Sequence, residues 1–581
     1  MNARRITQLT VAAALVATAG VGPAIAAGPP QLVKPVNITK PDLDPQRTYS
    51  APFLLANPSK PEQVVGGYLE FRTKRCGLVR SLDAGQTWKL LDASPTLKSY
   101  PFCEANNSNI FQAPLAWGRN DTLYMAMVAW DTQDSRQKVS VQLARSTDLG
   151  ESWTTTLVRD ARPTQDPKQE TNRPVTVVAV DSKSGSEDIV YVTYRRSVVN
   201  QSPGNSVVSQ PMVAVSTDGG KTFGEPVSAV GDALAADGPR TQAISATTIA
   251  ATASSTTTTT APAGSLAEKP NQAANFGGSN AGLTLDNKGA VYVGWKSTTA
   301  NVSPSAPSAI YVSKSTDRGK TWTPTQVQPF RYENGSTFLQ PFIKWSPEGG
   351  SAGTLHMVTE GSTRPELNAY ATIFYLRSTD GGKTWTAPKV LADDDPKNLN
   401  GKYIPNISLA PNGRVDVAWW DTRDDPGIRS NDVYYTYSTD NGTTWAKNIR
   451  ITDQTIDRRL GVWANNFDQS SPPSLASTNA YALVGWDDTR FSLNDKGTVQ
   501  LADPSVGPVG IGGGVQDMFV SAVQFQTLAG GTSKTVKIIL GGAIGLLAVG
   551  LILTVVALGS RRRRGEGEPS TSGPRSLADV G

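Results

Sequence analysis

The chain has 581 residues, of which 38% are hydrophobic and 18% charged, and its content of Gly, Pro and Trp is typical of a turn-rich protein. Two cysteines and one histidine exclude a zinc finger, a Cys/His metal cluster and a disulfide-dense scaffold. The formal net charge of +5 comes from Arg4, Arg5, Lys534, Lys537 and the tail after Gly559. The remainder is close to neutral, which argues against nucleic acid as a partner.

The N-terminus is typical of a secretory signal peptide over residues 1–26. Arg4 and Arg5 precede an apolar stretch from Val11 to Val21, and Ala24 and Ala26 provide a small-x-small cleavage pattern. The sequence therefore predicts that the chain is exported. Cys76 and Cys103 would then lie in an oxidising compartment, where we expect them to form a disulfide bond.

An eight-residue motif, Ser-x-Asp-x-Gly-x-Thr/Ser-Trp/Phe, recurs six times along the chain. Its aspartates are Asp83, Asp148, Asp218, Asp317, Asp380 and Asp440. The carboxylate can accept hydrogen bonds from turn amides, the Gly allows a positive φ, and extended runs precede the motif. We interpret it as a structural turn repeated once per unit rather than as six catalytic or calcium sites.

The units between these motifs can be divided into strands. The sixth contains runs over residues 404–410, 414–420, 432–437 and 446–451, and a seventh unit over residues 474–525 lacks the motif. An Ala/Thr-rich stretch over residues 246–270, with five consecutive Thr, is typical of a flexible insertion. Seven four-stranded units are thus favoured over six, within an ectodomain spanning residues 27–534.

The C-terminal region predicts a membrane anchor. An uncharged apolar stretch over residues 538–558, inside a predicted helix at 536–559, is long enough to span a bilayer. Arg561 to Arg564 follow it, so the tail, residues 560–581, is expected to be cytoplasmic and disordered. The expected protein is a single-pass cell-membrane protein with an N-terminal ectodomain outside and the lipid bilayer as one partner.

The six motifs resemble those of the Asp-box, or BNR-repeat, sialidase-like β-propellers, and the resemblance extends over about residues 45–527. It implies an all-β propeller of four-stranded blades in which the box joins the third and fourth strands of each blade. It also implies a ligand face opposite the boxes, because the loop after the second strand and the loop before the first strand share that face. Fold alone does not establish activity.

Candidate site residues follow from this face. The resemblance implies an arginine cluster for the substrate carboxylate, a Tyr activated by a Glu, and an Asp acid/base. The candidates are Glu70, Arg72, Arg173, Glu360, Tyr403, Asp421, Arg423, Asp487 and Arg490. A repeated Trp-Asp-(Asp)-Thr-Arg pattern contains the last four of these, and it can equally form ion pairs between blades.

Two features weigh against sialidase chemistry. Tyr49-Ser50-Ala-Pro52 stands where the family has Tyr-Arg-Ile-Pro, and no carboxylate occurs between Arg72 and Asp83. The sequence therefore predicts a membrane-anchored, bacterial surface propeller that acts on or binds extracellular glycans or glycoproteins. The alternative is a catalytically active exo-sialidase or other glycoside hydrolase with a rearranged site. No cofactor is expected; Asp393, Asp394 and Asp395 give only a weak indication of calcium, and the metal content is left open.

Overall fold

The computed structural model divides the chain into two units, Gln31–Gln524 and a second unit of Met1–Pro30 with Phe525–Gly581. The structure describes residues 29–42, 47–70, 75–91, 102–103, 114–130, 139–161, 168–200, 207–231, 282–297, 308–332, 341–361, 372–395, 400–425, 429–461, 472–492 and 515–525. The predicted signal peptide, the 246–270 insertion, the 536–559 helix and the tail lie outside these residues. Within the described residues, no helix is long and apolar enough to cross a membrane.

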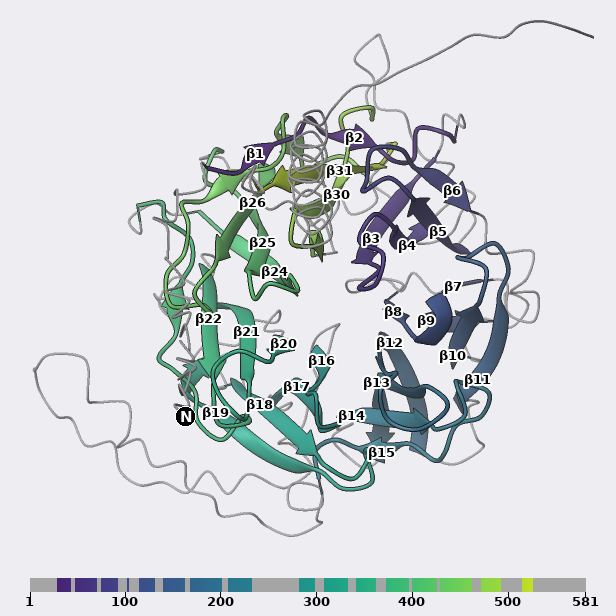
Figure 1. Cartoon of the computed structure of the whole chain (residues 1–581). Coiled ribbons are helices and arrows are strands. Elements are labelled where there is room, and N and C mark those ends of the chain that lie inside the picture. Colours follow the sequence, from purple (N-terminus) through teal and green to yellow (C-terminus); the bar gives the residue numbers. More distant parts are fainter. Residues whose placement is uncertain are drawn as a thin grey trace, which may run out of the picture. The chain divides into compact units, whose positions relative to one another are not determined.

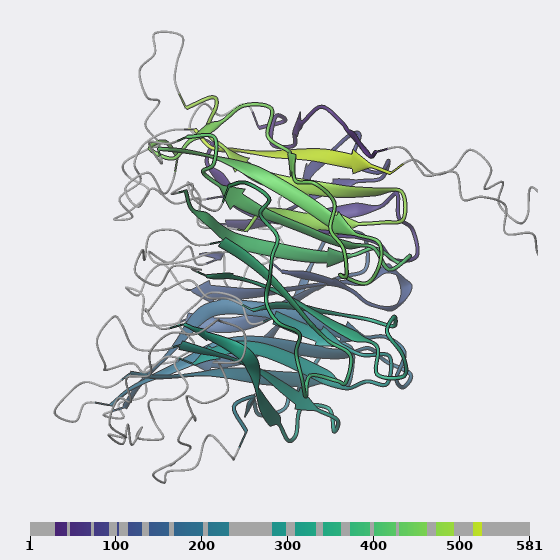
Figure 2. The same cartoon turned by 90° about the vertical axis from the view of Figure 1, so that its left-hand side faces the viewer.

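The unit Gln31–Gln524 is a β-propeller of seven antiparallel blades arranged around a centre (Figure 1). The all-β, seven-bladed prediction is therefore confirmed. In the described part of the chain the only helical segment is the 3-10 turn η1, Arg119–Asp121. Seen from the side, the strands of successive blades lie as stacked ribs that run between two faces (Figure 2).

The first four blades follow the chain from residue 49 to residue 332. Blade 1 contains β3 (Tyr49–Ala56), β4 (Val64–Glu70), β5 (Arg75–Ser81) and β6 (Lys89–Leu91). Blade 2 contains β7 (Phe102–Cys103), β8 (Leu115–Trp117), β9 (Leu123–Trp130), β10 (Val139–Ser146) and β11 (Thr154–Ala161), with β7 and β8 both paired to β9. Blade 3 contains β12 (Lys168–Asp181), β13 (Ile189–Asn200), β14 (Val207–Ser216) and β15 (Val227–Ser228). Blade 4 contains β16 (Gly282–Leu285), β17 (Val291–Ser297), β18 (Ser308–Ser315) and β19 (Thr323–Tyr332).

The last three blades include the one that closes the ring. Blade 5 contains β20 (Phe342–Ser346), β21 (Thr354–Gly361), β22 (Thr372–Ser378) and β23 (Lys389–Val390). Blade 6 contains β24 (Lys402–Leu409), β25 (Val415–Asp421), β26 (Ser430–Ser438) and β27 (Ile449–Arg450), and β28 (Ile456–Asp457) also pairs with β26. Blade 7 contains β29 (Ser474–Ser477), β30 (Tyr481–Asp488) and β31 (Asp517–Gln524).

The outer strand of blade 7 comes from the other end of the unit. β1 (Gln31–Leu32) and β2 (Val36–Asn37) both pair with β31, so the N-terminal segment completes the last blade (Figure 1). The junction is reinforced by Arg47, whose Nε and Nη2 donate to the two carboxylate oxygens of Asp517 at 2.7 and 2.9 Å. Because the first strands of the unit pair with the last one, β31 is not left as a free sheet edge and the two ends of the unit are joined in one blade.

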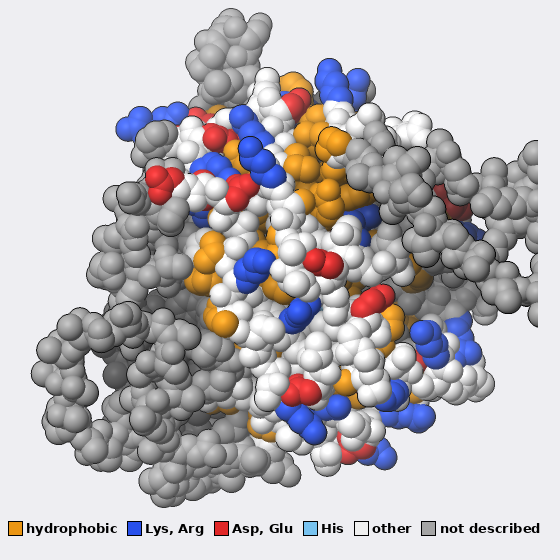
Figure 3. Space-filling view, turned by 60° about the vertical axis from the view of Figure 1, so that its left-hand side comes forward, with side chains coloured by type: hydrophobic (Ala, Val, Ile, Leu, Met, Phe, Trp, Pro, Cys, Tyr) orange, Lys and Arg blue, Asp and Glu red, His pale blue; other side chains and the backbone are white. Residues whose placement is uncertain are grey.

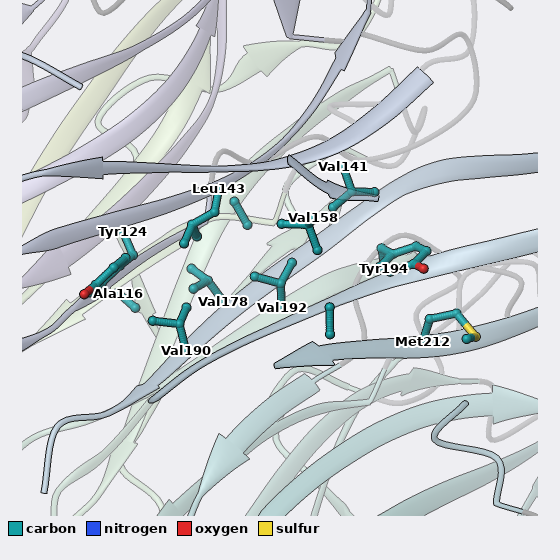
Figure 4. Close-up of a cluster of buried hydrophobic side chains, with 12 residues drawn as sticks. Ala116, Tyr124, Val141, Leu143, Val158, Val178, Val190, Val192, Tyr194 and Met212 are labelled. Atoms are coloured by element: carbon teal, nitrogen blue, oxygen red, sulfur yellow. The ribbon is translucent and has the colours of Figure 1, made fainter. Parts of the chain in front are cut away.

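The core lies between blades rather than inside one of them. The second strands are buried on both faces, as in β25, where all seven residues are buried; such strands have near-continuous apolar sequences. One cluster joins Tyr124, Val141 and Leu143 of blade 2 to Val190 and Val192 of blade 3 (Figure 4). Each blade therefore needs its neighbours to bury its apolar faces.

Cys76 on β5 is disulfide-bonded. The sequence contains one other cysteine, Cys103, on β7. The surface away from the core is of mixed charge: one face shows Lys or Arg side chains interspersed with Asp or Glu, without a broad area of one sign (Figure 3).

Candidate functional site

The box end of the propeller is held by its own turns. In each box the Ser hydroxyl donates to the Asp carboxylate, as Ser315 does to Asp317 at 2.8 Å, and also accepts from the Gly amide, here that of Gly319 at 2.8 Å. The Trp or Phe follows on the far side of the turn, and the Trp322 indole donates to the Gly319 carbonyl. The Thr321 hydroxyl and amide donate to the same carboxylate, and these bonds lower the pKa of Asp317 to about 2. The carboxylate is thus satisfied by the turn itself.

His356, the only histidine in the sequence, also lies near the box end. It is fully buried, with its Nε2 at 2.9 Å from the Ser346 hydroxyl and its Nδ1 at 2.7 Å from the Tyr375 hydroxyl. Burial lowers the pKa of His356 to about 3, helped by the charge of Arg377. The ring is neutral at physiological pH and serves as a buried hydrogen-bonding group.

The pairing of the strands places one residue of every second strand at an equivalent position, near the end of the strand that lies opposite the boxes. We call this the ring position. Each box serine pairs with an early residue of the second strand, for example Ser378 with Leu355 and Ser438 with Val415. Five residues further on, about 17 Å along a strand, lie Leu69, Val128, Arg195, Lys296, Glu360 and Trp420 in blades 1 to 6. In blade 7, where Trp486 matches Trp419, the equivalent residue is Asp487.

The ring residues of blades 5 and 7 are bonded to the first strand of the next blade. Glu360 Oε2 accepts a hydrogen bond from the Ile404 amide at 2.5 Å, and Asp487 Oδ2 accepts one from the Ser50 hydroxyl at 2.8 Å. Both contacts fall where the first strand bulges, between Ser50 and Phe53 on β3 and between Tyr403 and Asn406 on β24. A Pro lies in each bulge, where a missing N–H interrupts the ladder.

The bulge on β24 contains a backbone outlier. Ile404 has φ +49°, in the left-handed region that a β-branched residue rarely adopts, and the following Pro405 further disfavours that region. The hydrogen bond to the buried Glu360 holds this conformation. Bulges of this kind re-aim side chains and occur next to active sites.

A buried amine stands near Glu360. Lys296 on β17 is 3% exposed, and burial lowers the pKa of its ammonium to about 8, against the opposing charge of Glu360. Blades 4 and 5 therefore contribute one basic and one acidic group at the same ring position. Lys296 is not among the candidates that the sequence suggested.

Tyr403 and Asn431 meet at the same end of blade 6. The Asn431 amide donates to the Tyr403 hydroxyl at 2.5 Å, and the Arg458 guanidinium stands 5.0 Å from the centre of the Tyr403 ring. Glu360 bonds the residue next to Tyr403, so the structure brings these two candidates to one place. The sequence did not predict Asn431 as a site residue, because its place beside Tyr403 depends on the pairing of β26 with β28.

The candidate arginines Arg423 and Arg490 form ion pairs with aspartates of their own motif. Arg423 donates from Nε and Nη2 to Asp421 at 2.9 and 2.7 Å, and Arg490 binds Asp488 in the same way. Each also bonds an aspartate after the preceding blade, Asp393 for Arg423 and Asp453 for Arg490. The hydrogen bonds that Arg423 donates to Asp421, together with the charge of that carboxylate, raise the pKa of Arg423 despite burial.

The repeated motif has a register that the sequence did not indicate. The indole that donates to Asp421 is that of Trp419, and Trp486 donates to Asp488. Trp420 thus corresponds to Asp487 rather than to Trp486. Each arginine also lies over an aromatic ring of the third strand, 4.0 Å for Arg423 on Tyr434 and 4.2 Å for Arg490 on Phe519.

The remaining candidates are distributed over blades 1 and 3. Glu70 ends β4 and is 4% exposed, paired in register with Tyr49. Arg173 lies on β12 opposite Arg195 in the ladder, whereas Arg72 lies outside the described residues. Of the acidic run, Asp393 bonds Arg423 and Asn448, and Asp394 accepts from Lys402 at 2.7 Å. In the described part of the chain no group of three or more His, Cys, Asp or Glu side chains could hold a metal ion.

Comparison with known proteins finds one matching family model and several similar solved structures. The family described as BNR/Asp-box repeat matches residues 376–387, the fifth box. No curated protein matches the sequence. Similar solved structures include the phage phi92 endosialidase (10% identity, TM-score 0.42, 86% of this chain and 70% of that one) and the Hadza microbial sialidase Hz136 (12%, 0.38, 79% and 75%). Another is the Penicillium chrysogenum α-L-arabinanase complexed with arabinobiose (13%, 0.37, 67% and 94%).

The fold and the repeats define the class: this protein is a β-propeller built on repeated box turns. More narrowly, it is a seven-bladed Asp-box propeller with six boxes and one blade without a box.

Proposed function

We propose that this propeller binds glycans at the end opposite the boxes, which we call the channel mouth, and that it does not hydrolyse sialosides. The channel mouth comprises the residues at the ring position together with Ser50, Tyr403, Ile404 and Asn431. The observation that supports the proposal best is that Arg423 and Arg490 each form ion pairs with two aspartates, one in the arginine's own motif and one after the preceding blade. Neither guanidinium is available to clamp a substrate carboxylate.

Energetics support this reasoning. Removing one partner from a buried ion pair costs about 3–5 kcal/mol, whereas a hydrogen bond to a charged group contributes about 1.5–3 kcal/mol. A ligand carboxylate that took Arg423 from Asp421, which is fully buried, would therefore lose more than it gained. At the place of the family's first arginine, Ser50 bonds Asp487 instead.

The groups at the channel mouth suit hydroxyl-bearing ligands. They are the half-buried Tyr403 and its partner Asn431, next to the Ile404 amide that Glu360 holds, whereas Ser50 and Asp487 bond each other. Convergent polar side chains on a rigid scaffold are typical of small-molecule sites. Their donors and acceptors match the hydroxyls of a sugar ring.

A glycan array with the full-length chain tests the proposal, alongside turnover of a fluorogenic α-sialoside. We expect capture of extracellular glycans, at least tenfold weaker capture by Tyr403→Ala, and no sialoside turnover above the blank. Lys221→Ala is the matched control, since this exposed lysine lies in the third box. Glycan capture that is unchanged in Tyr403→Ala, or robust sialoside turnover, would contradict the proposal.

A glycoside hydrolase of exo-sialidase type with a rearranged site is the second candidate. It is favoured by one observation, the location of Glu360 and Tyr403 on adjoining blades at the same end, which a Tyr nucleophile activated by a Glu would need. Sialoside turnover that is lost in both Glu360→Gln and Tyr403→Phe, with unchanged unfolding midpoints, would establish this candidate.

We further propose that the propeller is displayed outside the cell on a single C-terminal span. The supporting features are the Arg4–Arg5 signal pattern and the apolar stretch 538–558 followed by Arg561 to Arg564. Protease treatment of intact cells should remove the propeller and leave a C-terminal tag protected. Loss of the tag from intact cells, or protection of the propeller, would contradict this topology.

A further inference from the structure

One buried polar atom at the channel mouth lacks a partner. Asn431 is 1% exposed, and its Nδ2 donates to the Tyr403 hydroxyl, but its Oδ1 has no hydrogen-bond partner among the described residues. Buried side-chain acceptors are satisfied in the large majority of cases, and each exception needs an explanation. A ligand group at Oδ1 is one such explanation.

The surroundings of Asn431 are built by three strands of one blade. Asn431 is near the start of β26 and pairs in register with Ile456 of β28, while Tyr403 comes from β24. Arg458, just after β28, places its guanidinium over the Tyr403 ring. The amide is therefore fixed by backbone pairing on one side and by the tyrosine on the other.

The position of Tyr403 is maintained at a cost in backbone strain. Ile404, with φ +49° and Pro405 after it, adopts a conformation that neither its side chain nor its successor favours. The carboxylate of Glu360 holds it from the neighbouring blade through the 2.5 Å bond to the Ile404 amide. Strained conformations that the surroundings enforce are concentrated at binding and active sites.

We propose that Asn431 Oδ1 is the hydrogen-bond acceptor for a hydroxyl of a neutral sugar, with Tyr403 beside it and Glu360 as the residue that positions Tyr403. This inference rests on the proposed glycan binding and names the chemistry of one contact. The ligand group must be a donor, because an amide oxygen only accepts. It is a hydroxyl rather than an ammonium, because the Arg458 guanidinium at this site disfavours a second cation.

This contact differs from recognition of an acidic sugar. An acidic sugar is held by charge-assisted bonds to arginine, and Arg423 and Arg490 are already engaged by aspartates. At Asn431 the site instead reads the presence of one hydroxyl. A site built to bond a hydroxyl discriminates strongly against an analogue that lacks it.

Blade 6 offers a matched control for Asn431. Asn406 on β24 has its amide satisfied at both ends: Nδ2 donates to the Pro473 carbonyl at 3.1 Å and Oδ1 accepts from the Ile407 amide at 2.9 Å. Asn431→Ala and Asn406→Ala therefore delete the same group from one blade. Only the first deletes an acceptor without a partner.

The experiment measures binding of the full-length chain to a panel of neutral methyl hexopyranosides and their monodeoxy analogues by saturation-transfer NMR, with methyl α-sialoside as the acidic comparison. We expect Asn431→Ala to weaken binding of the preferred neutral glycoside at least tenfold and Asn406→Ala to change it less than threefold. For the wild-type protein, one monodeoxy analogue should bind at least tenfold more weakly than the parent sugar. For Asn431→Ala, the same analogue should bind no more weakly than the parent sugar. Asn431→Asp, which keeps an acceptor and the side-chain shape, should retain binding if Asn431→Ala does not fold.

The outcomes separate the two proposals. If glycans bind and Asn431→Ala binds them as wild type does, the acceptor role is wrong and the proposed function stands. Asn431→Leu replaces Asn431→Ala in this test if the alanine variant does not fold. Water would then satisfy Oδ1. Preference for the sialoside over every neutral glycoside would also overturn the inference. If no glycan on the array or in the panel binds, both proposals fall. Glu360→Gln, which keeps an acceptor for Ile404, should retain binding better than Glu360→Ala, as a positioning role requires.

Discussion

The box end and the channel mouth are the two ends of the same second strands, yet they differ in how their polar groups are used. At the box end the same residues repeat six times, and each carboxylate is satisfied within its own turn, as Asp317 is by Ser315 and Thr321. At the channel mouth the ring position carries a different residue type in every blade. Repetition at one end indicates a shared structural task, and divergence at the other indicates that the blades act differently there.

The polar contacts also differ in reach. Within each box the hydrogen bonds to the Ser and Asp side chains span at most four residues, such as Gly382 to Ser378, while Arg80 and Asn441 link boxes to other blades. Mouth contacts cross between blades, from Glu360 to Ile404 and from Ser50 to Asp487. Left-handed non-Gly residues occur at both ends, but those of the boxes, such as Arg318, stand in tight turns, whereas Ile404 at the mouth is β-branched and precedes a proline. A buried amide oxygen without a partner also occurs at both ends, in Asn431 at the mouth and in Asn441 of the sixth box. The following changes separate the roles of the two ends.

The largest expected effect is at a buried ion pair near the box end. Asp416 is fully buried and accepts from Arg414 at 2.8 and 3.0 Å. We expect Asp416→Ala to lower the free energy of unfolding by about 3–5 kcal/mol, because the Arg414 charge stays buried without its carboxylate. Denaturant unfolding measures this, with Glu151→Ala as a control expected to cost far less, because the Glu151 carboxylate that pairs with Arg80 is 45% exposed. Equal costs for the two changes would show that the buried pair is not structural.

The next effect concerns the arginines that the mouth shares with the structural motif. Arg423→Ala leaves the buried Asp421 carboxylate without its partner and is expected to cost about 3 kcal/mol of unfolding free energy, the lower end for a buried ion pair, because Arg423 itself is 10% exposed. Glycan binding per folded molecule should be unchanged, and Arg490→Ala should behave alike. Loss of binding without loss of stability would assign Arg423 to the ligand and not to the fold.

The boxes should respond through stability alone. Asp380→Ala deletes the bonds from Ser378 and Thr384, and Gly382→Ala places a Cβ at φ +88° and 3.3 Å from a Leu355 methyl. Each is expected to cost about 1–3 kcal/mol. The melting temperature should fall while ligand binding persists wherever the protein folds. An unchanged melting temperature with lost binding would make the box a functional site.

The effect that is smallest at neutral pH, and grows only on acidification, is a pH dependence at His356. Its pKa falls from 6.5 to about 3 on folding because the ring is buried, so the native state binds fewer protons than the unfolded state between these values. Stability from the neutral ring is complete above about pH 6.5 and is lost as pH falls through this window, by at most about 1.4 kcal/mol per pH unit. Because the sequence has one histidine, its NMR resonance can be followed directly. Titration near pH 6.5, or an unchanged pH slope in His356→Gln, would contradict the buried neutral ring.

The two ends also differ in how far the sequence predicts them. The seven units and six box turns follow from local spacing, because each box contains its own donors and acceptors. The register of Trp419 against Trp486 did not follow, since two adjacent tryptophans leave the pairing open until the strands are aligned. The completion of blade 7 by β1 and β2 depends on pairing between residues almost the whole unit apart.

The site was harder to predict than the fold for the same physical reason. Glu360 and Tyr403 were expected at one face, and the structure adds that Glu360 bonds the Ile404 backbone. Arg423 and Arg490 were expected there as ligand or ion-pair residues, and their aspartate partners are now defined. Asn431 has no motif, because its importance arises from an oxygen left unpaired where three strands meet.

One substitution at the channel mouth and one in a box, compared in the same assay, test most directly whether the ligand binds at the channel mouth. Binding of the full-length chain to a glycan-coated surface is measured for wild type, Tyr403→Ala and Asp380→Ala, at a temperature where circular dichroism shows all three folded. We expect Tyr403→Ala to bind at least tenfold more weakly while its melting temperature stays close to that of wild type. We expect Asp380→Ala to bind as wild type does, despite its lower melting temperature. Wild-type binding by Tyr403→Ala together with lost binding by folded Asp380→Ala would contradict it and place the ligand at the boxes.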